Sequence, residues 1–303
     1  MSDSKSEVET NVQRCYSTWG ETYYRDYYGE NAPYPPVHIN LLRELIINSG
    51  AKSVIDAGCG PASFLRHLTG DNLELYGFDL TAEMVSEAKR VMTDLGFNPN
   101  QVWQGSVLKE YDYRRPGFPL RYDAAICFGV LPHIPVQDDE TVLQNLFNSV
   151  SPGGLVIVEA RNALFSLFTQ NRYTYEFVRD ELIRSEELIA YADSKKPEIT
   201  EALVTYQKHF RMDLPPIRIG KTGEPGYDQV LSRTHNPLVL ARQFTQMGFQ
   251  NVQTLFYHFH ALPPMFAGLT GDFFKAASVR MESPRDWRGY FMASAFIITG
   301  TRL

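Results

Sequence analysis

The chain has little cysteine, no long apolar run and no excess of basic residues. Only three of its 303 residues are cysteines, Cys15, Cys59 and Cys127, and their spacing matches neither a disulfide framework nor a zinc cluster. The start, MSDSKSEVET, has no apolar stretch after a basic one, and no later run approaches the roughly 20 apolar residues of a membrane helix. We therefore expect a cytoplasmic protein that is neither exported nor associated with a membrane.

The balance of charge argues against a nucleic-acid partner. The chain has 29 Lys and Arg against 35 Asp and Glu, which gives a net charge of -6, the wrong sign for a protein that binds phosphate backbones. With 44% hydrophobic residues it has enough apolar side chain for a compact core. We expect a monomer or homodimer that acts on a small molecule.

Strands and helices alternate in the middle third of the chain. Residues 81–96 have the signature of an amphipathic helix, with Thr81 at the N-cap position and Gly96 as the stop. The other segments of this pattern are the strands 52–58, 73–79, 101–107, 122–130 and 153–160 and the helices 63–70 and 138–150. Such alternation predicts an α/β fold with a parallel, Rossmann-like sheet covered on both faces.

The rhythm breaks on both sides of this region. Residues 1–40 are rich in tyrosine and predict an N-terminal helical cap, and we expect residues 41–161 to form the Rossmann-like core. Residues 162–235 contain helical patterns without a convincing strand, so we interpret them as a helical lid inserted over the sheet. Residues 236–303 return to the core with a helix and the last two strands, 251–260 and 289–303.

The sharpest motif is VIDAGCGPASFL at 54–65. Asp56 stands near the end of a strand, and Gly58 and Gly60 follow in a turn that lets backbone approach a ligand closely. A carboxylate before the glycines repels pyrophosphate, so a cofactor with an amino group and no phosphate suits the site better than a dinucleotide. Asp79 ends the next strand, where a carboxylate can accept hydrogen bonds from both ribose hydroxyls or, alternatively, cap the following helix.

Five segments together carry a family resemblance. VIDAGCGPASFL, GFDLTAEMVSEAK, QGSV, YDAAICFGVLPHIP and SPGGLVIVE resemble, in order and spacing, the motifs of class I S-adenosylmethionine-dependent methyltransferases, over about residues 50 to 160. The resemblance implies a seven-stranded sheet whose last strand is inserted antiparallel, with S-adenosyl-L-methionine as the cofactor. The resemblance does not depend on the glycine turn alone, because all five motifs are present in the expected order.

The resemblance also implies the cofactor contacts. They are Asp56, Gly58 and Gly60 at the methionine, Asp79 at the ribose, Leu80, Met84, Gly105, Ser106 and Val107 at the adenine, and Cys127, Phe128 and Gly129 at the methionine and sulfonium. Two positions depart from the pattern. Ala62 stands at the usual third glycine, and Ser106 replaces the acidic residue that often meets the adenine amino group.

The tyrosines of YSTWGETYY resemble those of the first helix in many small-molecule methyltransferases, which closes over the cofactor. Tyr16, Tyr23 or Tyr24 would meet the methionine carboxylate through a hydroxyl, or the sulfonium through a ring face, since aromatic faces attract cations. Ordinary packing of an amphipathic helix explains the same residues equally well. We include Tyr16 and Tyr24 among the candidate cofactor contacts.

The catalytic base is a separate question, because a hydroxyl acceptor needs one whereas a neutral amine needs little more than placement. His133 follows the fourth strand, at the edge where the substrate should lie, and His235 is the second candidate. We assign the acceptor to a further group of polar residues: Arg161, Asn162, Tyr173, His258 and His260. Each of these also has an ordinary structural interpretation, and we expect no metal ion.

The sequence thus predicts a methyltransferase whose acceptor is a hydroxyl of a sugar or other polar metabolite. A small-molecule amine is the alternative acceptor. Two rivals belong to other classes. A nicotinamide-dependent oxidoreductase would need pyrophosphate beside Asp56, and a non-catalytic S-adenosylmethionine-binding protein would keep the fold without the chemistry.

Overall fold

A computed structural model describes residues 3–19, 22–29, 32, 34–216 and 229–303. These residues form two compact units. The first unit takes in the described parts of 1–161, 218–255 and 296–303, and the second takes in 162–217 and 256–295. No helix in the described part of the chain is long and apolar enough to cross a membrane.

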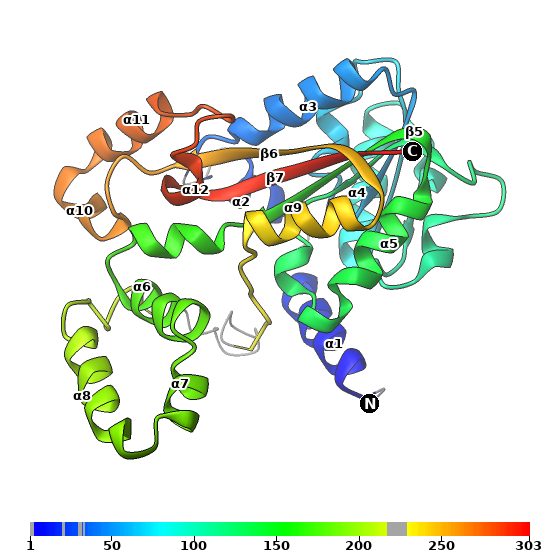
Figure 1. Cartoon of the computed structure of the whole chain (residues 1–303). Helices are drawn as coiled ribbons and strands as arrows, with labels where there is room; N and C mark the ends of the chain where they lie inside the picture. The colour runs from blue at the N-terminus through cyan, green and yellow to red at the C-terminus, as the bar shows by residue number, and fades with distance from the viewer. Residues whose placement is uncertain (1–2, 20–21, 30–31, 33, 217–228) are drawn as a thin grey trace. The chain divides into compact units, whose positions relative to one another are not determined.

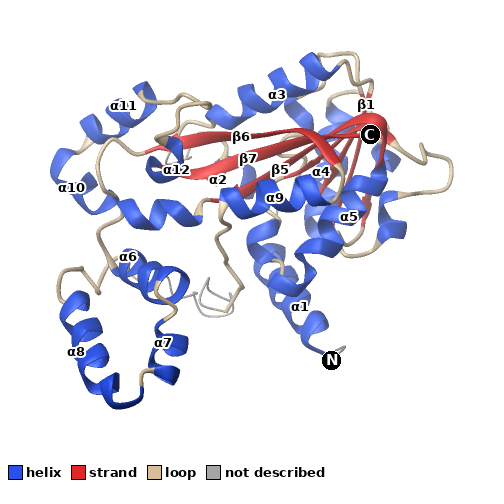
Figure 2. Ribbon diagram, viewed as in Figure 1, coloured by secondary structure: helices blue, strands red, loops and turns tan. Residues whose placement is uncertain are grey.

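A seven-stranded mixed sheet is the centre of the fold (Figure 2). Its strand order is β3-β2-β1-β4-β5-β7-β6, so the last strand lies between the fifth and the sixth, as the family resemblance predicts. The strands are β1 Ser53–Ala57, β2 Glu74–Asp79, β3 Val102–Gln104, β4 Tyr122–Cys127, β5 Val150–Arg161, β6 Phe249–Phe259 and β7 Ala293–Arg302. The predicted α/β fold class is confirmed.

The strands β3, β2, β1, β4 and β5 run parallel to one another. Val54 and Ile55 of β1 and Ala124 and Ala125 of β4 are fully buried on both faces, as expected of a parallel sheet covered by helices. Because parallel strands end at the same edge, the residues that follow β1, β2 and β4 meet there. This edge contains the candidate site.

The first unit also contains α-helices, several of which pack on this sheet (Figure 1). They are α1 Asp3–Ser17, α2 Thr22–Tyr27, α3 Val37–Ser49, α4 Ala82–Asp94, α5 Asp139–Ser149 and α9 Pro237–Gln246. Helix α4 packs on β2 and β3, and α5 packs on β4 and β5. The predicted helix 81–96 is confirmed, with Met84 and Met92 buried, but the Thr81 side chain makes no capping hydrogen bond.

The predicted helix 63–70 is wrong in extent. Only the short 3-10 turn η1, Leu65–His67, forms there. Ala62 just before it has φ +58°, in the left-handed region, where a residue with a Cβ is strained. The left-handed residue breaks the regular helical backbone at the start of the expected helix.

The second unit is helical between 162 and 216, as its sequence pattern indicates (Figure 1). Its elements include η6 Ala163–Phe168, α6 Arg172–Phe177, the π-helix η7 Val178–Leu182, α7 Ser185–Tyr191, α8 Lys196–Gln207, α10 Ala267–Thr270, α11 Asp272–Arg280 and α12 Gly289–Met292. Ala163, Leu164 and Phe177 form a buried apolar cluster. The two units do not coincide with the four parts predicted from the sequence. A lid function for residues 162–235 stays a prediction.

Candidate active site

The loop after β1 depends on glycine. Gly58 has φ +89°, and a Cβ on it would lie 2.3 Å from Cγ2 of Val130. The backbone N–H groups of Gly58 and Cys59 both donate to the carbonyl of Phe78, at 2.8 and 2.9 Å. These bonds tie the loop to β2, so the glycine turn and the end of β2 form one rigid edge of the site.

Asp79 stands at the end of β2 and organises this edge. Its Oδ2 accepts a hydrogen bond from the Gly60 N–H, and its Oδ1 accepts one from the Thr81 N–H, each at 2.9 Å. Burial raises the pKa of Asp79, while these backbone hydrogen bonds lower it. Both oxygens keep further lone pairs, which is the arrangement needed to accept two neighbouring hydroxyls.

Asp56 is fully buried beneath the same loop. Neither of its carboxylate oxygens has a hydrogen-bond partner among the described residues. Burial raises the pKa of Asp56 well above its usual range, and the nearby charge of Asp79 raises it further. Its side chain does not line the cavity described next, so a direct contact between Asp56 and a ligand stays a prediction.

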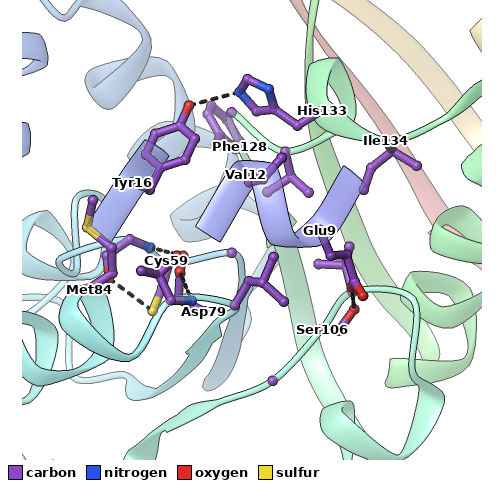
Figure 3. A pocket seen from close by; sticks show the side chains of 18 of the residues that line it. Glu9, Val12, Tyr16, Cys59, Asp79, Met84, Ser106, Phe128, His133 and Ile134 are labelled. Atoms are coloured by element: carbon purple, nitrogen blue, oxygen red, sulfur yellow. Dashed lines mark hydrogen bonds between the residues drawn. The ribbon is translucent and has the colours of Figure 1, made fainter. Parts of the chain in front are cut away.

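A cavity with an empty volume of about 950 Å³, part of it open to solvent, lies at this edge of the first unit (Figure 3). Most of its lining is apolar or aromatic. The lining residues are Val8, Glu9, Val12, Tyr16, Tyr23, Tyr28, Gly58, Cys59, Gly60, Ser63, Phe64, Asp79, Leu80, Thr81, Met84, Gly105, Ser106, Val107, Leu108, Phe128, Gly129, Val130, His133, Ile134, Pro135 and Asp138. Within the described chain, this lining contains no Lys or Arg, which disfavours a phosphate-bearing ligand.

Most of the predicted cofactor contacts lie around this cavity. Gly58, Gly60, Asp79, Leu80, Met84, Gly105, Ser106, Val107, Phe128, Gly129 and Tyr16 line it, whereas Cys127 and Tyr24 do not. The Tyr24 hydroxyl instead lies 2.8 Å from Nε2 of His67, and its ring stacks under the guanidinium of Arg66. Cys127 is fully buried in β4. Contacts of these two side chains with a cofactor stay predictions.

Helix α1 reaches the loop after β3. The Ser106 hydroxyl donates to Oε1 of Glu9 at 2.5 Å. The same hydroxyl oxygen accepts from the Leu108 N–H at 3.2 Å, and the Ser106 N–H donates to Asp112. Ser106 therefore has no donor left for a ligand, and Glu9 brings a carboxylate to this end of the cavity (Figure 3).

A second contact of α1 involves His133, in the 3-10 turn η4, Leu131–His133. Nδ1 of His133 lies 2.7 Å from the carbonyl oxygen of Leu231, and Nε2 lies 2.8 Å from the Tyr16 hydroxyl. Because a carbonyl only accepts, Nδ1 carries the proton and Nε2 is the acceptor. Burial lowers the pKa of His133 to about 4, so at neutral pH the ring is a neutral base.

Residues 231–235 hold η4 in place. The Arg233 N–H donates to the carbonyl of Pro132, and its Nε donates to the carbonyl of Ile134. Its guanidinium also pairs with Asp139 at the start of α5. His235 is buried beside this pair, 3.5 Å from Asp139, and does not line the cavity. A catalytic role for His235 stays a prediction that this position does not support.

The predicted acceptor residues are dispersed. Arg161 donates to the Ser232 hydroxyl. In the second unit, the Asn162 amide donates to the carbonyls of Gly289, Tyr290 and Ala293, which gives it a structural role. Contacts of Arg161 and Asn162 with an acceptor stay predictions.

The other candidates also lie in the second unit. Tyr173 is 42% exposed, and His258 has φ +57°. His260 packs on Phe165 and Phe274, and burial lowers its pKa to about 4. A role in acceptor binding stays a prediction for all three. In the described residues, no group of three or more His, Cys, Asp or Glu is arranged to hold a metal ion.

The sequence did not single out Glu9 and Gln13. The Gln13 amide donates to the carbonyl of Leu80 at 2.8 Å. With Tyr16, these residues recur at intervals of four and three, which places them on one face of a helix. That spacing of polar groups was a usable signal for a helix face that contacts a site.

Comparison with known proteins identifies a methyltransferase domain in the chain. Residues 55–156, which contain the glycine loop, Asp79 and His133, match the model of a methyltransferase domain. This segment is a methyltransferase domain, and the fold matches that of class I S-adenosylmethionine-dependent methyltransferase structures. The methyltransferase shares its fold with magnesium protoporphyrin IX methyltransferase from Synechocystis PCC 6803 solved with bound S-adenosylhomocysteine, at a TM-score of 0.52 and 15% identity, over 98% of this chain and 100% of that one.

Other known proteins also resemble the chain, one in fold and two in sequence. A complex of DhpI with S-adenosylhomocysteine gives a TM-score of 0.51 and 13% identity, over 98% of both chains. The ubiquinone biosynthesis O-methyltransferase of Proteus mirabilis is 26% identical over 52% of this chain and 66% of its own length. The enzyme of the same name from Shewanella sp. is 24% identical over 64% of this chain and 83% of its own length. The matched segment thus spans about two thirds of the Proteus enzyme.

The cavity fits the cofactor of this family. S-adenosylmethionine has a ribose, a sulfonium cation and no phosphate, and the cavity offers the Asp79 carboxylate, aromatic faces and, among the described residues, no Lys or Arg. The buried Ser63 hydroxyl, which lines the cavity, has no partner among the described residues and is available to a ligand. Cofactor binding in this cavity stays a prediction, and these side chains are consistent with it.

Proposed function

We propose that this methyltransferase transfers a methyl group to a hydroxyl oxygen of a small molecule, and that Tyr16 and His133 remove the hydroxyl proton. The observation that carries the proposal is the fixed tautomer of His133. The carbonyl of Leu231 holds the proton on Nδ1, and Nε2 faces the Tyr16 hydroxyl at 2.8 Å. A hydroxyl is a poor nucleophile without such a base, whereas a neutral amine needs none.

The proton follows the hydrogen bonds. When bound, S-adenosylmethionine supplies the electrophilic methyl group. Tyr16 lines the cavity and donates to Nε2, so it stands between an acceptor hydroxyl and the nearly buried ring of His133. As the acceptor oxygen takes the methyl group, its proton passes to the Tyr16 oxygen, and the Tyr16 proton passes to Nε2. His133 becomes an imidazolium ion and releases the proton after turnover.

The lining of the cavity supports an acceptor with a flat apolar body in place of a sugar. Phe64 and Phe128 pack at 4.6 Å between ring centroids, and Tyr28 packs on Phe64 at 5.3 Å. Such faces bind aromatic and apolar groups. The sequence favoured a sugar or other polar metabolite, and this remains the second acceptor class.

The relatives from Proteus mirabilis and Shewanella sp. carry the name O-methyltransferase, which supports an oxygen acceptor. We also propose that the reaction takes place in the cytoplasm, since Cys15, Cys59 and Cys127 form no disulfide bonds. A monomer or homodimer without a nucleic-acid partner fits the acidic composition.

The test is a methyl-transfer assay with methyl-labelled cofactor and three acceptor panels: hydroxylated aromatics, sugars and small amines. We expect an ether product from a hydroxylated aromatic, formed by the wild type and not by His133→Asn. Label on nitrogen that persists in His133→Asn would contradict the proposal. If a sugar hydroxyl is labelled and the labelling requires His133, the proposed role of His133 as the base is supported, but the acceptor is a sugar and not a hydroxylated aromatic.

A further inference from the structure

The adenine end of the cavity lacks the acidic residue that the family resemblance places in the loop after β3. Ser106 occupies that position, and its only hydroxyl proton is already donated to Glu9. Its backbone N–H is donated to Asp112. Ser106 alone therefore cannot distinguish a nucleobase with an amino group from one with a carbonyl group.

Glu9 can accept a hydrogen bond from a ligand amino group through its carboxylate. Its Oε1 accepts from the Ser106 hydroxyl at 2.5 Å. Its second oxygen, Oε2, has no hydrogen-bond partner in the described part of the chain. Glu9 lines the cavity, so a strong acceptor is held in place by one oxygen while the other is available to a ligand.

The arrangement of the cavity indicates which part of the cofactor meets this oxygen. Asp79 marks the ribose, and Tyr16 with His133 marks the reacting end (Figure 3). A nucleoside has its 5′ substituent and its base on different sides of the ribose. If the sulfur faces Tyr16 and His133, the base extends toward the remaining polar end of the cavity, where Glu9 and Ser106 lie (Figure 3).

We infer that Glu9 of helix α1 is the residue that recognises the adenine of the cofactor, by accepting a hydrogen bond from the exocyclic amino group through Oε2. This inference rests on the cofactor orientation in the proposed function. Its chemistry is specific, since an amino group donates and a carbonyl does not.

The experiment compares two ligands by titration calorimetry with no acceptor present: S-adenosylhomocysteine and S-inosylhomocysteine, which has a carbonyl in place of the amino group. We expect the wild type to prefer the adenosine ligand by about tenfold or more, the scale of a hydrogen bond to a charged group that is lost or left unpaired. Glu9→Gln offers an amide donor in place of Oε2, so this variant should lose or reverse the preference.

Two control variants separate recognition from the attachment of α1. Ser106→Ala removes the hydrogen bond to Glu9 but keeps the carboxylate, and Gln13→Ala removes the hydrogen bond to Leu80. Both should keep the wild-type preference even if both ligands bind more weakly. An unchanged preference in Glu9→Gln overturns the inference, and so does an equal loss of preference in Ser106→Ala.

The wild type alone gives a second measurement that needs no variant to fold. An S-adenosylhomocysteine analogue with two methyl groups on the amino nitrogen has no donor, so it should bind at least about tenfold more weakly. Equal affinity overturns the role of Glu9. Because no acceptor is present, these outcomes are independent of the methyl-transfer assay. The binding data can support adenine recognition by Glu9 even if hydroxyl methylation is not observed, and hydroxyl methylation can be observed even if Glu9 does not recognise adenine.

Discussion

The hydroxyl of Tyr16 lies 2.8 Å from Nε2 of His133, although the two residues are 117 positions apart in the chain. The contact joins the N-terminal helix to the turn after β4 across the cavity (Figure 3). It brings together a proton donor, a neutral imidazole and the space for a ligand. The proposed chemistry depends on this pair.

Replacing Tyr16 by Phe removes the hydroxyl that, in the proposed mechanism, passes the proton to Nε2 of His133. We expect turnover to fall about tenfold or more, in the range of general-base effects, with S-adenosylhomocysteine affinity within about threefold of the wild type because only one neutral hydrogen bond is lost. Steady-state kinetics and calorimetry check both values. Unchanged turnover would show that the acceptor reaches His133 without Tyr16.

Replacing His133 by Asn keeps a donor for the carbonyl of Leu231 but removes the base. We expect turnover to fall about 100-fold or more, since positioned bases contribute on that scale, while cofactor affinity stays close to that of the wild type. The measurement is the turnover number beside the dissociation constant for S-adenosylhomocysteine. A variant with full activity removes His133 from the mechanism.

The acid side of the pH profile should reflect a lowered histidine pKa. Burial lowers the pKa of His133 to about 4, so the neutral form persists below its usual range. We expect turnover at saturating cofactor to stay level through pH 6 and to fall as the pH approaches 4. A fall centred near the ordinary histidine value of about 6.5 would contradict the assignment.

The same lowered pKa makes a prediction for stability. Between the ordinary value and about 4, the unfolded chain binds a proton at residue 133 that the folded chain does not. The free energy of unfolding should therefore decrease as the pH falls through this range. In His133→Asn this contribution should be absent, and denaturant titrations at several pH values would show the difference.

Replacing Asp79 by Ala removes the two carboxylate oxygens proposed to accept from the ribose, and with them the partner of the Gly60 and Thr81 N–H groups. We expect S-adenosylhomocysteine affinity to weaken by about 2 kcal/mol or more, the scale of lost hydrogen bonds to a charged group. Asp71→Ala is the matched control, because that carboxylate pairs with Arg43 and does not line the cavity. Equal affinities in the two variants would show that the ribose lies elsewhere.

Gly58→Ala tests the loop itself. The positive φ of Gly58 and the 2.3 Å approach of a Cβ to Val130 predict a loss of stability of about 1 to 3 kcal/mol. Gly70→Ala is the control, since a Cβ there meets no atom within 4 Å. Thermal unfolding of the two variants should differ clearly, with Gly70→Ala close to the wild type.

Sequence pattern predicted the parts of the site that lie along the chain. The spacing of Asp56, Gly58 and Asp79 specifies a strand, a turn and a second strand, and β1 and β2 form at these positions. Helix α4 followed from its apolar periodicity. Only η1 formed where a helix over residues 63–70 was expected, and no propensity scale indicates the left-handed backbone of Ala62 just before it.

The contacts between distant segments could not be predicted in the same way. Glu9 meets Ser106 across 97 positions, and His133 meets Leu231 across 98. Such pairs depend on how α1 and residues 231–235 pack against the sheet edge, which has no period in the sequence. The sequence therefore predicted Ser106 as an adenine contact in place of the usual acidic residue, without showing that Glu9 lies beside it.

The distance between the sulfur of bound S-adenosylhomocysteine and Nε2 of His133, in a crystal structure of their complex, tests the orientation that connects every step of the mechanism. An acceptor oxygen in contact with the methyl group and linked to His133 through Tyr16 requires a separation of about 10 Å or less. We predict a sulfur that faces Tyr16, with the ribose hydroxyls on Asp79. A sulfur turned away from Tyr16, or a ribose far from Asp79, would contradict the proposed mechanism.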